Sequence, residues 1–533
     1  MLRVRPHIVT AVRSNVLHAR RHLHTSRFLI NNEWVAPAAG SDAAHMPVIN
    51  PATGAEIATI ALGDEADIDK AVAAAQVAFE AEWGDVSVGH RIELLRSLGD
   101  LYQQRMLRMA ELISEEMGCP IKLATAAQAA AGLGHIQTFT KVLSEFAFEA
   151  PLEPGSRRPQ QQLLRHEPIG VCGLITPWNW PMNQVALKVA PALAAGNTVV
   201  LKPSEVAPLS SLYFAEMLVD AGFPPGAFNL VNGRGEMAGD ALARHPAVGA
   251  VSFTGSTRAG VAVTRAAAAT VKRVTLELGG KGPNLVFADV GGASELRAAV
   301  SRGVRACFVN SGQSCNAPTR MLVERSVYAD ALGYAAEAAG AVAVGLPALE
   351  GHHIGPVASA AQYDKVQRLI QSGIDEGATL LVGGPGRAEP SVTADSTTTT
   401  AAADAADTGD GGAGYFCRPT VFADVAPHMR LFREEIFGPV LSITPFEDEA
   451  DAVRLANDTC YGLTSYLQTG CDERARRVAR RLRAGMVEVN GARRSGGAPF
   501  GGVRQSGNGR EGGEHGLREF LEVKAIAGWP AGA

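Results

Sequence analysis

The sequence predicts an α/β fold in which helices cover both faces of a Rossmann-like parallel sheet. Two observations support this prediction: short apolar or β-branched runs alternate with longer helical patterns, and polar residues follow the runs directly. The strand-like runs are residues 170–175, 198–201, 228–231, 250–253 and 274–276, with helical patterns at 185–195 and 210–221. Alternation of this kind is typical of parallel sheets that are buried on both faces. Ligands of such sheets bind at the carboxyl ends of the strands.

The rest of the chain predicts further helices and a second α/β domain. Apolar residues recur every three to four positions between residues 65 and 148, which indicates surface helices that pack on the sheet. Beyond Glu277 the alternation resumes, with a helix expected at 297–307 and strands at 317–324 and 520–526. A chain of 533 residues is too long for one ordinary core, so two or more domains are expected.

The amino-terminal segment differs in composition from the rest. Residues 1–32 contain six arginines and no acidic residue, and they lack a continuous apolar stretch. This composition is typical of a mitochondrial presequence, which we place at residues 1–26. It predicts a location in the mitochondrial matrix. A disordered extension on a cytoplasmic protein is the alternative, and in both cases folded structure is expected to start near Phe28.

Composition also excludes several classes of function. A formal net charge of -5 argues against a nucleic-acid partner, because such proteins usually carry a basic face. No apolar run approaches the roughly 20 residues that span a bilayer, so no membrane association is expected. The seven cysteines are scattered without metal-ligand spacing, so we expect neither a metal site nor a disulfide framework.

Two segments interrupt the α/β pattern. Residues 151–165 are rich in proline, arginine and glutamine, which is compatible either with an exposed arm or hairpin used in assembly or with a plain loop. Residues 389–414 are a low-complexity insert of threonine, alanine, aspartate and glycine that cannot bury a core. We expect this insert to be a mobile surface loop without function.

Three residues have the chemistry of a covalent mechanism. Cys315 lies among glycine, serine and asparagine rather than in an apolar run, which favours a presented thiol over a packed one. Asn179 follows the first strand and could donate to a developing oxyanion, although a turn asparagine needs no such role. Glu277 ends a strand between two leucines, so burial should raise its pKa and suit it to general-base work. A structural glutamate that accepts backbone hydrogen bonds is the alternative.

Other strand ends suggest a dinucleotide site. The sheet lacks a GxGxxG sequence, but Gly255 and Ser256 precede a helix whose backbone N–H groups could hold a phosphate. Lys202 and Glu205 follow the second strand, where a carboxylate can accept ribose hydroxyls and repel a 2'-phosphate. NAD is therefore favoured over NADP. A solvent-exposed ion pair is the competing interpretation of Lys202 and Glu205.

Seven motifs in sequence order resemble the NAD(P)-dependent aldehyde dehydrogenase superfamily. They are TPWNWP, LKPSE, FTGSTRAG, LELGGK, FVNSGQSCNAPTR, EEIFGPV and PFGGVRQSGNGREGG, and the resemblance covers roughly residues 28–527. It implies that Cys315 attacks an aldehyde and that Asn179 and the Cys315 backbone N–H hold the oxyanion. It also implies that hydride passes to NAD, and that water activated by Glu277 hydrolyses the thioester.

The resemblance assigns further positions to the site. Lys188 and Glu511 would relay protons from Glu277. The cofactor would be held by residues from several motifs, namely Thr176, Pro177, Trp178, Lys202, Glu205, Gly255, Ser256, Leu278, Gln362, Glu435 and Phe437. Gln184 and Leu187 would line the substrate tunnel without indicating a particular substrate.

The resemblance also implies a three-part subunit. We expect a cofactor domain from residues 27–150 and 168–277, and a catalytic domain from residues 278–514. Residues 151–167 and 515–533 would form a small β arm that makes homodimers or homotetramers.

Three uncertainties about function stay open. A CoA-acylating semialdehyde dehydrogenase and a catalytically retired NAD-binding structural protein are the alternatives to a hydrolytic enzyme. Glu277 argues against the first, and the joint presence of Asn179, Glu277 and Cys315 argues against the second. Adjacent Arg493 and Arg494 near the expected substrate mouth could bind a substrate carboxylate, although exposed arginines are common on solvated loops.

Overall fold

The structure, a computed structural model, describes residues 23–81, 83–152, 162–391 and 414–529. Its larger sheet has eight strands in the order β2-β1-β9-β8-β7-β10-β11-β21. Their bounds are β1 Phe28–Ile30, β2 Glu33–Val35, β7 Val171–Ile175, β8 Thr198–Lys202, β9 Phe228–Leu230, β10 Val248–Thr254, β11 Arg273–Glu277 and β21 Gly507–Asn508. The five central strands are parallel, as the sequence predicts. Every side chain of β7 and β8 is buried, which explains their unbroken apolar sequences.

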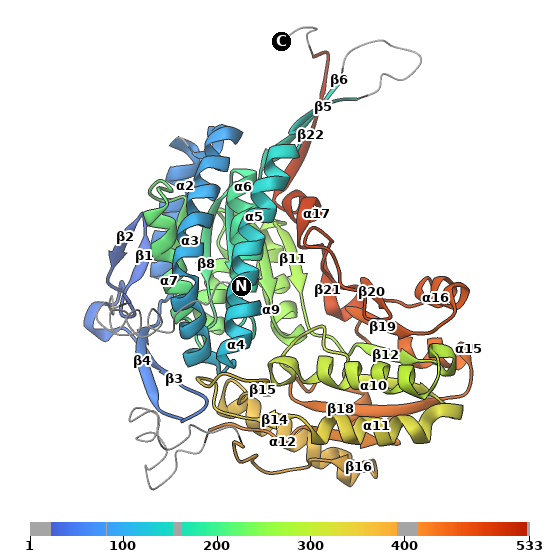
Figure 1. Cartoon of the computed structure of the whole chain (residues 1–533). Coiled ribbons are helices and arrows are strands. Elements are labelled where there is room, and N and C mark those ends of the chain that lie inside the picture. The colour runs from blue at the N-terminus through green and yellow to red at the C-terminus, as the bar shows by residue number, and fades with distance from the viewer. Residues whose placement is uncertain (1–22, 82, 153–161, 392–413, 530–533) are drawn as a thin grey trace, which may run out of the picture.

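Helices form more than one layer over this sheet (Figure 1). Contacts with the strands come from α2 (Glu65–Ala81), α6 (Pro181–Ala195), α7 (Leu209–Asp220), α8 (Asp240–Arg244) and α9 (Thr257–Ala267). The long helices α3 (Val88–Met117) and α5 (Ala130–Glu145) pack on α7 and α6 instead. The prediction that all helices of residues 65–148 pack on the sheet is therefore wrong for α3 and α5. Their apolar faces bury against other helices, a choice that helical periodicity alone does not reveal.

A second sheet has seven strands in the order β16-β17-β18-β13-β12-β19-β20. Their bounds are β12 Pro283–Val286, β13 Arg320–Glu324, β16 Thr379–Val382, β17 Thr420–Ala423, β18 Val440–Phe446, β19 Thr464–Gln468 and β20 Met486–Val489. All neighbours are parallel except β16, which is antiparallel to β17. The accompanying helices are α10 Ala293–Phe308, α11 Tyr328–Gly340, α12 Ala360–Asp375, α15 Glu449–Asn457 and α16 Asp472–Ala479. This sheet confirms that the α/β alternation resumes after Glu277.

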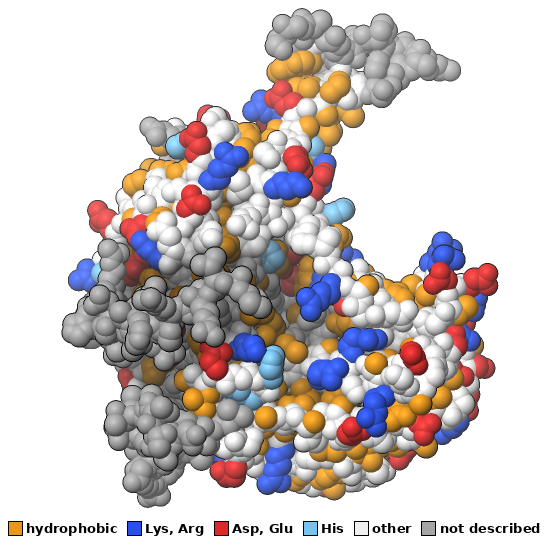
Figure 2. All heavy atoms as spheres, viewed as in Figure 1, with side chains coloured by type: hydrophobic (Ala, Val, Ile, Leu, Met, Phe, Trp, Pro, Cys, Tyr) orange, Lys and Arg blue, Asp and Glu red, His pale blue; other side chains and the backbone are white. Residues whose placement is uncertain are grey.

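One short strand links the two halves of the chain. Strand β21 follows the second sheet in sequence but pairs antiparallel with β11 of the first, with Gly507 opposite Glu277. The predicted catalytic segment 278–514 thus contributes an edge strand to the first sheet. In the view shared by Figures 1 and 2, the surface has a hollow between the part built on the first sheet and the part built on the second. Hydrophobic, basic and histidine side chains surround this hollow (Figure 2).

Residues near 151–165 form part of a projecting three-stranded sheet (Figure 1). Its order is β22-β6-β5, from β5 (Glu149–Leu152), β6 (Gln162–Pro168) and β22 (Leu521–Ala527). The carboxyl-terminal strand aligns Leu521 with Pro168 at one end. Between the two alternatives that the sequence left open, the described parts of this segment favour the hairpin. Residues 153–161, which join β5 to β6, lie outside the described residues.

Some elements were missed by the sequence analysis, and some predictions fall on residues that the structure does not describe. The hairpin of β3 (His45–Ile49) and β4 (Glu56–Ala61) was not predicted. Most of the predicted presequence, residues 1–22, lies outside the described residues, as do residues 392–413 of the low-complexity insert. Within the described ranges, no helix is both long and apolar enough to cross a membrane.

Candidate active site

The candidate site lies at the carboxyl edge of the first sheet. A cavity of about 180 Å³ contains Cys315 and lies beside the ends of β7 and β10. Eleven residues that the sequence analysis placed in the site line it: Pro177, Trp178, Asn179, Gln184, Gly255, Ser256, Leu278, Cys315, Gln362, Glu435 and Phe437. Leu187, which was expected in the substrate tunnel, is not among the lining residues. The eleven come from helices α6 and α12 and from segments that follow or join the strands. The fold therefore brings together positions that are more than 250 residues apart in sequence.

The loop that presents Cys315 has an unusual backbone. After α10 ends at Phe308, three consecutive residues have positive φ: Asn310 at 54°, Ser311 at 56° and Gly312 at 74°. A Cβ atom built on Gly312 would lie 2.0 Å from the carbonyl oxygen of Gly438. Only glycine fits this position, because the Gly438 segment packs directly on the turn. Backbone strain of this kind persists only where surrounding contacts enforce it.

Hydrogen bonds hold the strained loop in place. The Gln313 side chain donates to the Asn310 carbonyl at 3.0 Å and accepts from the Ala358 N–H at 2.8 Å. Next to the cysteine, Trp180 Nε1 donates to the Ser314 hydroxyl at 2.8 Å. These contacts fix the backbone on the amino-terminal side of Cys315, so the thiol is held at a defined position.

Asn179 is oriented toward the same loop. Its Nδ2 donates to the Gln313 carbonyl at 3.0 Å, and its own carbonyl accepts from Asn310 Nδ2 at 2.8 Å. The first bond uses one of the two amide hydrogens and leaves the second for another acceptor. Because Asn179 and Cys315 line one cavity, this second hydrogen is available to a group that binds there.

Electrostatics around Cys315 favour the protonated thiol. Burial is the main cause that raises the pKa of the Cys315 thiol, and the carboxylates of Glu277, Glu435 and Glu511 raise it further. A thiol is a poor nucleophile compared with its thiolate. A nucleophilic role for Cys315 would therefore require a nearby group that accepts the thiol proton.

Glu277 is a buried carboxylate that acts electrostatically on Cys315. It is 3% exposed, and neither carboxylate oxygen has a hydrogen-bond partner among the described residues. Burial raises the pKa of Glu277 well above its ordinary value, and Glu511 raises it further, whereas Lys188 and Arg510 lower it. At Gly501, which has φ of 153°, a Cβ would lie 2.6 Å from Glu277 Oε1. The glycine-rich segment therefore leaves room for this carboxylate.

Lys188 and Glu511 form a buried ion pair near Glu277. The Lys188 ammonium contacts a Glu511 carboxylate oxygen and also donates to the Ser252 hydroxyl at 3.0 Å. Reciprocal backbone hydrogen bonds of 2.7 Å between Phe500 and Glu511 fix the glutamate. Both residues act electrostatically on Glu277. This placement agrees with the relay that the sequence resemblance implies.

Glu435 and Gln362 also line the cavity. Glu435 Oε1 accepts from the Gly280 N–H at 2.8 Å, and a Cβ on Gly279 would lie 2.4 Å from its other oxygen. The paired glycines of LELGGK thus allow this close approach. Gln362 Nε2 donates to the Phe437 carbonyl at 2.8 Å, and the Phe437 ring meets Trp178 edge-on with centroids 5.5 Å apart.

The remaining predicted cofactor residues lie around the strand ends. Ser256 caps α9 by accepting from the Ala259 N–H at 3.2 Å, so the first turn of this helix faces the cavity. Lys202 and Glu205 form an ion pair of 2.8 Å, and the Thr176 N–H donates to the Lys202 carbonyl at 3.2 Å. Carboxylate, ammonium and helix N-terminus are the groups that bind ribose hydroxyls and phosphates. These residues fit a dinucleotide.

Sequence reasoning missed three residues that line the cavity. Thr254 and Gly279 belong to quoted motifs but were not singled out. Lys365 comes three residues after Gln362 on α12, so both lie on one helical face. That spacing was a usable signal once Gln362 had been chosen.

Arg494 has partners in the fold that weaken its predicted role in carboxylate binding. Its Nε lies 2.9 Å from Glu488, and its guanidinium stacks over the Phe500 ring with 4.9 Å to the centroid. Its charge is therefore offset by a carboxylate of the chain itself. Arg493 is exposed.

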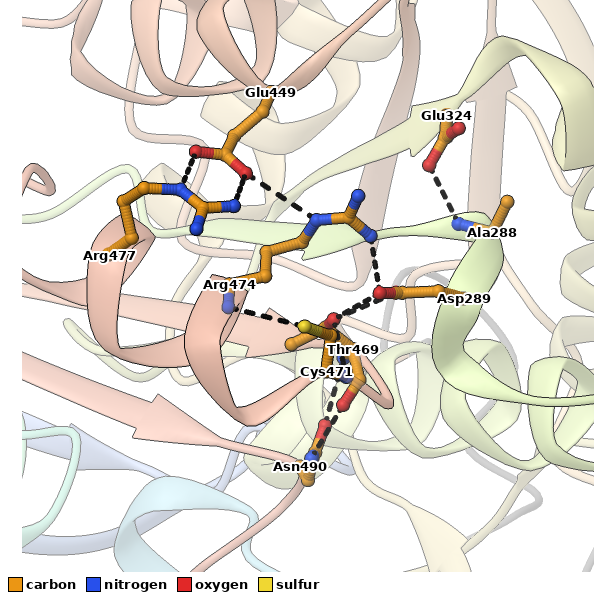
Figure 3. Close-up of polar contacts among 9 residues, drawn as sticks. All are labelled: Ala288, Asp289, Glu324, Glu449, Thr469, Cys471, Arg474, Arg477 and Asn490. Carbon is orange, nitrogen blue, oxygen red and sulfur yellow. Dashed lines mark hydrogen bonds and ion pairs between the residues drawn. The ribbon is translucent and has the colours of Figure 1, made fainter.

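At the carboxyl edge of the second sheet, polar side chains pair with one another (Figure 3). Asp289 and Thr469 follow β12 and β19, and the Thr469 hydroxyl donates to Asp289 at 2.7 Å. Arg474 contacts both Asp289 and Glu449, and Glu449 also pairs with Arg477 at 2.7 Å. Ligands of parallel sheets usually bind at this edge. Here the polar groups satisfy one another, whereas those around Cys315 face a cavity.

Comparison with known proteins decides the family. A model described as the aldehyde dehydrogenase family matches residues 37–526. The chain belongs to the aldehyde dehydrogenase family. One relative, 3-succinoylsemialdehyde-pyridine dehydrogenase from a Pseudomonas species, is 48% identical over 504 residues, which are 94% of this chain and 98% of the relative.

Solved structures of aldehyde dehydrogenases share the fold. The aldehyde dehydrogenase of Bartonella henselae is 51% identical with a TM-score of 0.87, covering 95% of this chain and 99% of that one. A mutant of aldehyde dehydrogenase C from Pseudomonas syringae, in complex with NAD+ and octanal, is 46% identical with a TM-score of 0.87. That match covers 96% of this chain and 98% of the neighbour.

These findings confirm the family, the α/β fold class and the enzyme class that the sequence predicts. At the level of the family they also confirm NAD as the cofactor, because solved aldehyde dehydrogenases hold NAD+. The relatives named above are bacterial, and they give no support to mitochondrial targeting.

Proposed function

We propose that this aldehyde dehydrogenase oxidises an aldehyde to the carboxylic acid with NAD, through a thioester on Cys315 that water hydrolyses. The observation that carries the proposal is the placement of three groups. Cys315 and Asn179 line one cavity, and the buried Glu277 carboxylate, which has no hydrogen-bond partner among the described residues, acts electrostatically on Cys315. A nucleophile, an oxyanion donor and a base are the groups that acyl chemistry requires.

The first half-reaction begins at the thiol. Sγ of Cys315 forms a bond to the aldehyde carbon, the carbonyl electron pair moves to the oxygen, and Glu277 accepts the thiol proton. Asn179 Nδ2 and the Cys315 backbone N–H hold the oxyanion. The bound NAD supplies a hydride acceptor. When the carbonyl re-forms, the hydrogen on the substrate carbon leaves with its electron pair, and a thioester remains on Cys315.

The second half-reaction releases the acid. Glu277 first gives up the proton that it took from the thiol, and the Lys188–Glu511 pair, which acts electrostatically on Glu277, can pass that proton onward. The ionised Glu277 then takes a proton from water as the water oxygen bonds to the thioester carbon. The carbon–sulfur bond breaks, the sulfur leaves with its electron pair as a thiolate, and Glu277 returns its proton to the sulfur. Each cycle thus consumes aldehyde, water and NAD and releases acid, NADH and a proton.

The cofactor would be held by the residues around the strand ends. Glu205 and Lys202 would contact the adenosine ribose, and Ser256 with the first turn of α9 would contact the pyrophosphate. Gln362, Glu435 and Phe437 would hold the nicotinamide riboside. The positions of Thr176, Pro177, Trp178, Gly255 and Leu278 are compatible with contacts along the same path.

Two further parts of the proposal concern the whole protein. The projecting sheet of β5, β6 and β22 would join copies into a homodimer or homotetramer. Residues 1–26 would direct the chain to the mitochondrial matrix, a proposal that rests on composition alone; the alternative is a cytoplasmic enzyme. Import of the full chain into isolated mitochondria, with shortening at the amino terminus, tests the targeting part.

NADH formation by the purified chain tests the proposed reaction. We would assay aliphatic, aromatic and carboxylated aldehydes with NAD, with and without CoA. The proposal predicts NADH formation without CoA and release of the free acid. Turnover that requires CoA would favour the acylating alternative, and NAD binding without oxidation of any aldehyde would favour a retired enzyme.

A further inference from the structure

Gln184 has a buried amide that the proposed mechanism does not use. It lies in the first turns of α6, is 4% exposed, and lines the same cavity as Cys315 and Asn179. Its Oε1 is buried without a hydrogen-bond partner among the described residues. One end of the amide is therefore an unsatisfied buried polar group, whichever way round its oxygen and nitrogen are assigned.

An unsatisfied amide at this depth carries a cost. Leaving a buried polar group without a partner costs about 1–3 kcal/mol, and a methionine of similar length would avoid it. Nearby polar side chains of α6 have partners: Asn183 bonds to His135 at 2.9 Å, and Lys188 bonds to Ser252 and Glu511. Gln184 is the exception, and it faces the reacting cysteine. This combination points to a ligand that completes the hydrogen bonds.

The position of Gln184 favours the substrate over the cofactor as that ligand. It follows Asn179, the candidate oxyanion donor, by five residues. The residues proposed to hold the nicotinamide riboside come from other elements, including Gln362 of α12 and Glu435. Gln184 and Asn179 therefore line the cavity from one short stretch of chain at the start of α6, whereas the proposed nicotinamide contacts do not.

Charges near Cys315 narrow the class of substrate. Glu435 lines the cavity with Cys315, and Glu277 and Glu511 also act electrostatically on the thiol. These carboxyl groups outnumber Lys365, the cation among the described lining residues, so a substrate carboxylate close to Cys315 would be repelled. Arg494, which could offset this repulsion, is already paired with Glu488. A neutral group suits the uncharged amide better.

We propose that Gln184 selects aldehydes that carry a neutral hydrogen-bonding group, such as a ketone or hydroxyl, a few bonds from the aldehyde carbon. This inference rests on the proposed function and adds a substrate class to it. Gln184 acts as a specificity residue: its amide pairs with the substrate's polar group, which places C1 against Sγ of Cys315. An unsubstituted aldehyde leaves the amide unpaired.

The test compares pentanal with 4-oxopentanal, which differ by one carbonyl. The variant Gln184→Met removes the amide and keeps the length of the side chain. The matched control is Gln104→Met, the same substitution at an exposed glutamine of α3 outside the cavity. We expect kcat/KM for 4-oxopentanal to fall about tenfold in Gln184→Met, with no fall for pentanal. Gln104→Met should keep the ratio of the two substrates.

Two outcomes would overturn the inference. The first is an unchanged ratio of the two kcat/KM values in Gln184→Met, whether both values fall equally or neither falls. The second is an effect confined to the KM for NAD, which would assign the amide to the cofactor. In each of these outcomes NADH still forms, so the proposed function stands. Absence of NADH from both aldehydes with the wild-type chain would contradict the proposed function and this inference together.

Discussion

At the scale of single residues, the site depends on where protons are held. Glu277 is buried, lies near Glu511, and receives no hydrogen bond from the described residues. Burial and Glu511 both raise the pKa of its carboxyl group, and no hydrogen bond from the described residues stabilises the charged form. A buried carboxylate that accepts no hydrogen bonds is costly to ionise, which makes it a stronger base when ionised. The same environment that disfavours the charge thus supports its proposed task.

The raised pKa of Glu277 gives a prediction for the pH dependence. A carboxyl group serves as a base only when ionised, and a raised pKa moves ionisation to higher pH. We therefore expect steady-state turnover to rise with pH through the neutral range. Glu277→Gln should lower both the first turnover of NADH and steady-state turnover roughly 100-fold or more, because the proposed mechanism uses Glu277 as the base in both half-reactions.

Stopped-flow measurement of NADH from pH 5 to 9 checks this prediction. Glu514→Gln is the control, because Glu514 is an exposed partner of Arg518 outside the cavity. A flat pH profile, or wild-type turnover in Glu277→Gln, would remove Glu277 from the hydrolytic step.

At the scale of elements, the presentation of Cys315 depends on the turn after α10. Gly312 has φ of 74°, and a Cβ there would meet the Gly438 carbonyl at 2.0 Å. Gly312→Ala should therefore displace the turn, cost about 1–3 kcal/mol and lower activity at least tenfold. Gly333→Ala is the control, since Gly333 lies on exposed α11 with nothing within 4 Å of its Cβ position.

Melting temperatures and turnover of these two variants check the prediction. Alanine is the better helix former, so Gly333→Ala should match or exceed the wild-type melting temperature. If Gly312→Ala retained wild-type activity and stability, the turn would not be the element that holds Cys315.

The elements could be predicted from the sequence where burial leaves a periodic pattern. Strands β7 and β8 are buried along their whole length, so they appear as unbroken apolar runs. The β3–β4 hairpin was missed because its exposed positions and Pro47 dilute the alternation. Strand β21 has two residues, Gly507 and Asn508, and two residues carry no period.

The site residues also differ in whether the sequence could predict them. Cys315, Asn179 and Glu277 were predicted because their local sequences are unusual for structural residues. Lys365 was missed because its role depends on how α12 is turned toward the cavity. The unpaired amide of Gln184 could not be predicted at all, since the absence of a partner is a property of packing and not of sequence.

At the scale of the whole molecule, the site needs both sheets. The carboxyl edge of the first sheet supplies Glu277 and the proposed cofactor residues, and the segment before β13 of the second sheet supplies Cys315. Strand β21 joins the two by pairing Gly507 with Glu277. Relative motion of the two parts would separate Cys315 from Glu277, so this link is expected to stabilise the assembled site.

The projecting sheet gives a prediction about assembly. Val523 on β22 is 60% exposed, although it is a large apolar side chain on an edge strand. Exposed edges of this kind favour pairing with another chain. Val523→Glu should therefore lower the mass of the particle measured by light scattering. Val77→Glu on α2, where Val77 is 66% exposed, should leave the mass unchanged. An identical mass for both variants would exclude β22 from the interface.

The most direct test of the account is NADH formation by Cys315→Ala, with NAD binding measured by calorimetry on the same preparation. We predict no NADH from any aldehyde that the wild-type chain oxidises, together with unimpaired NAD binding. Cys460→Ala, which alters an exposed cysteine outside the cavity, should oxidise aldehydes at the wild-type rate. Sustained aldehyde oxidation by Cys315→Ala would contradict the covalent mechanism.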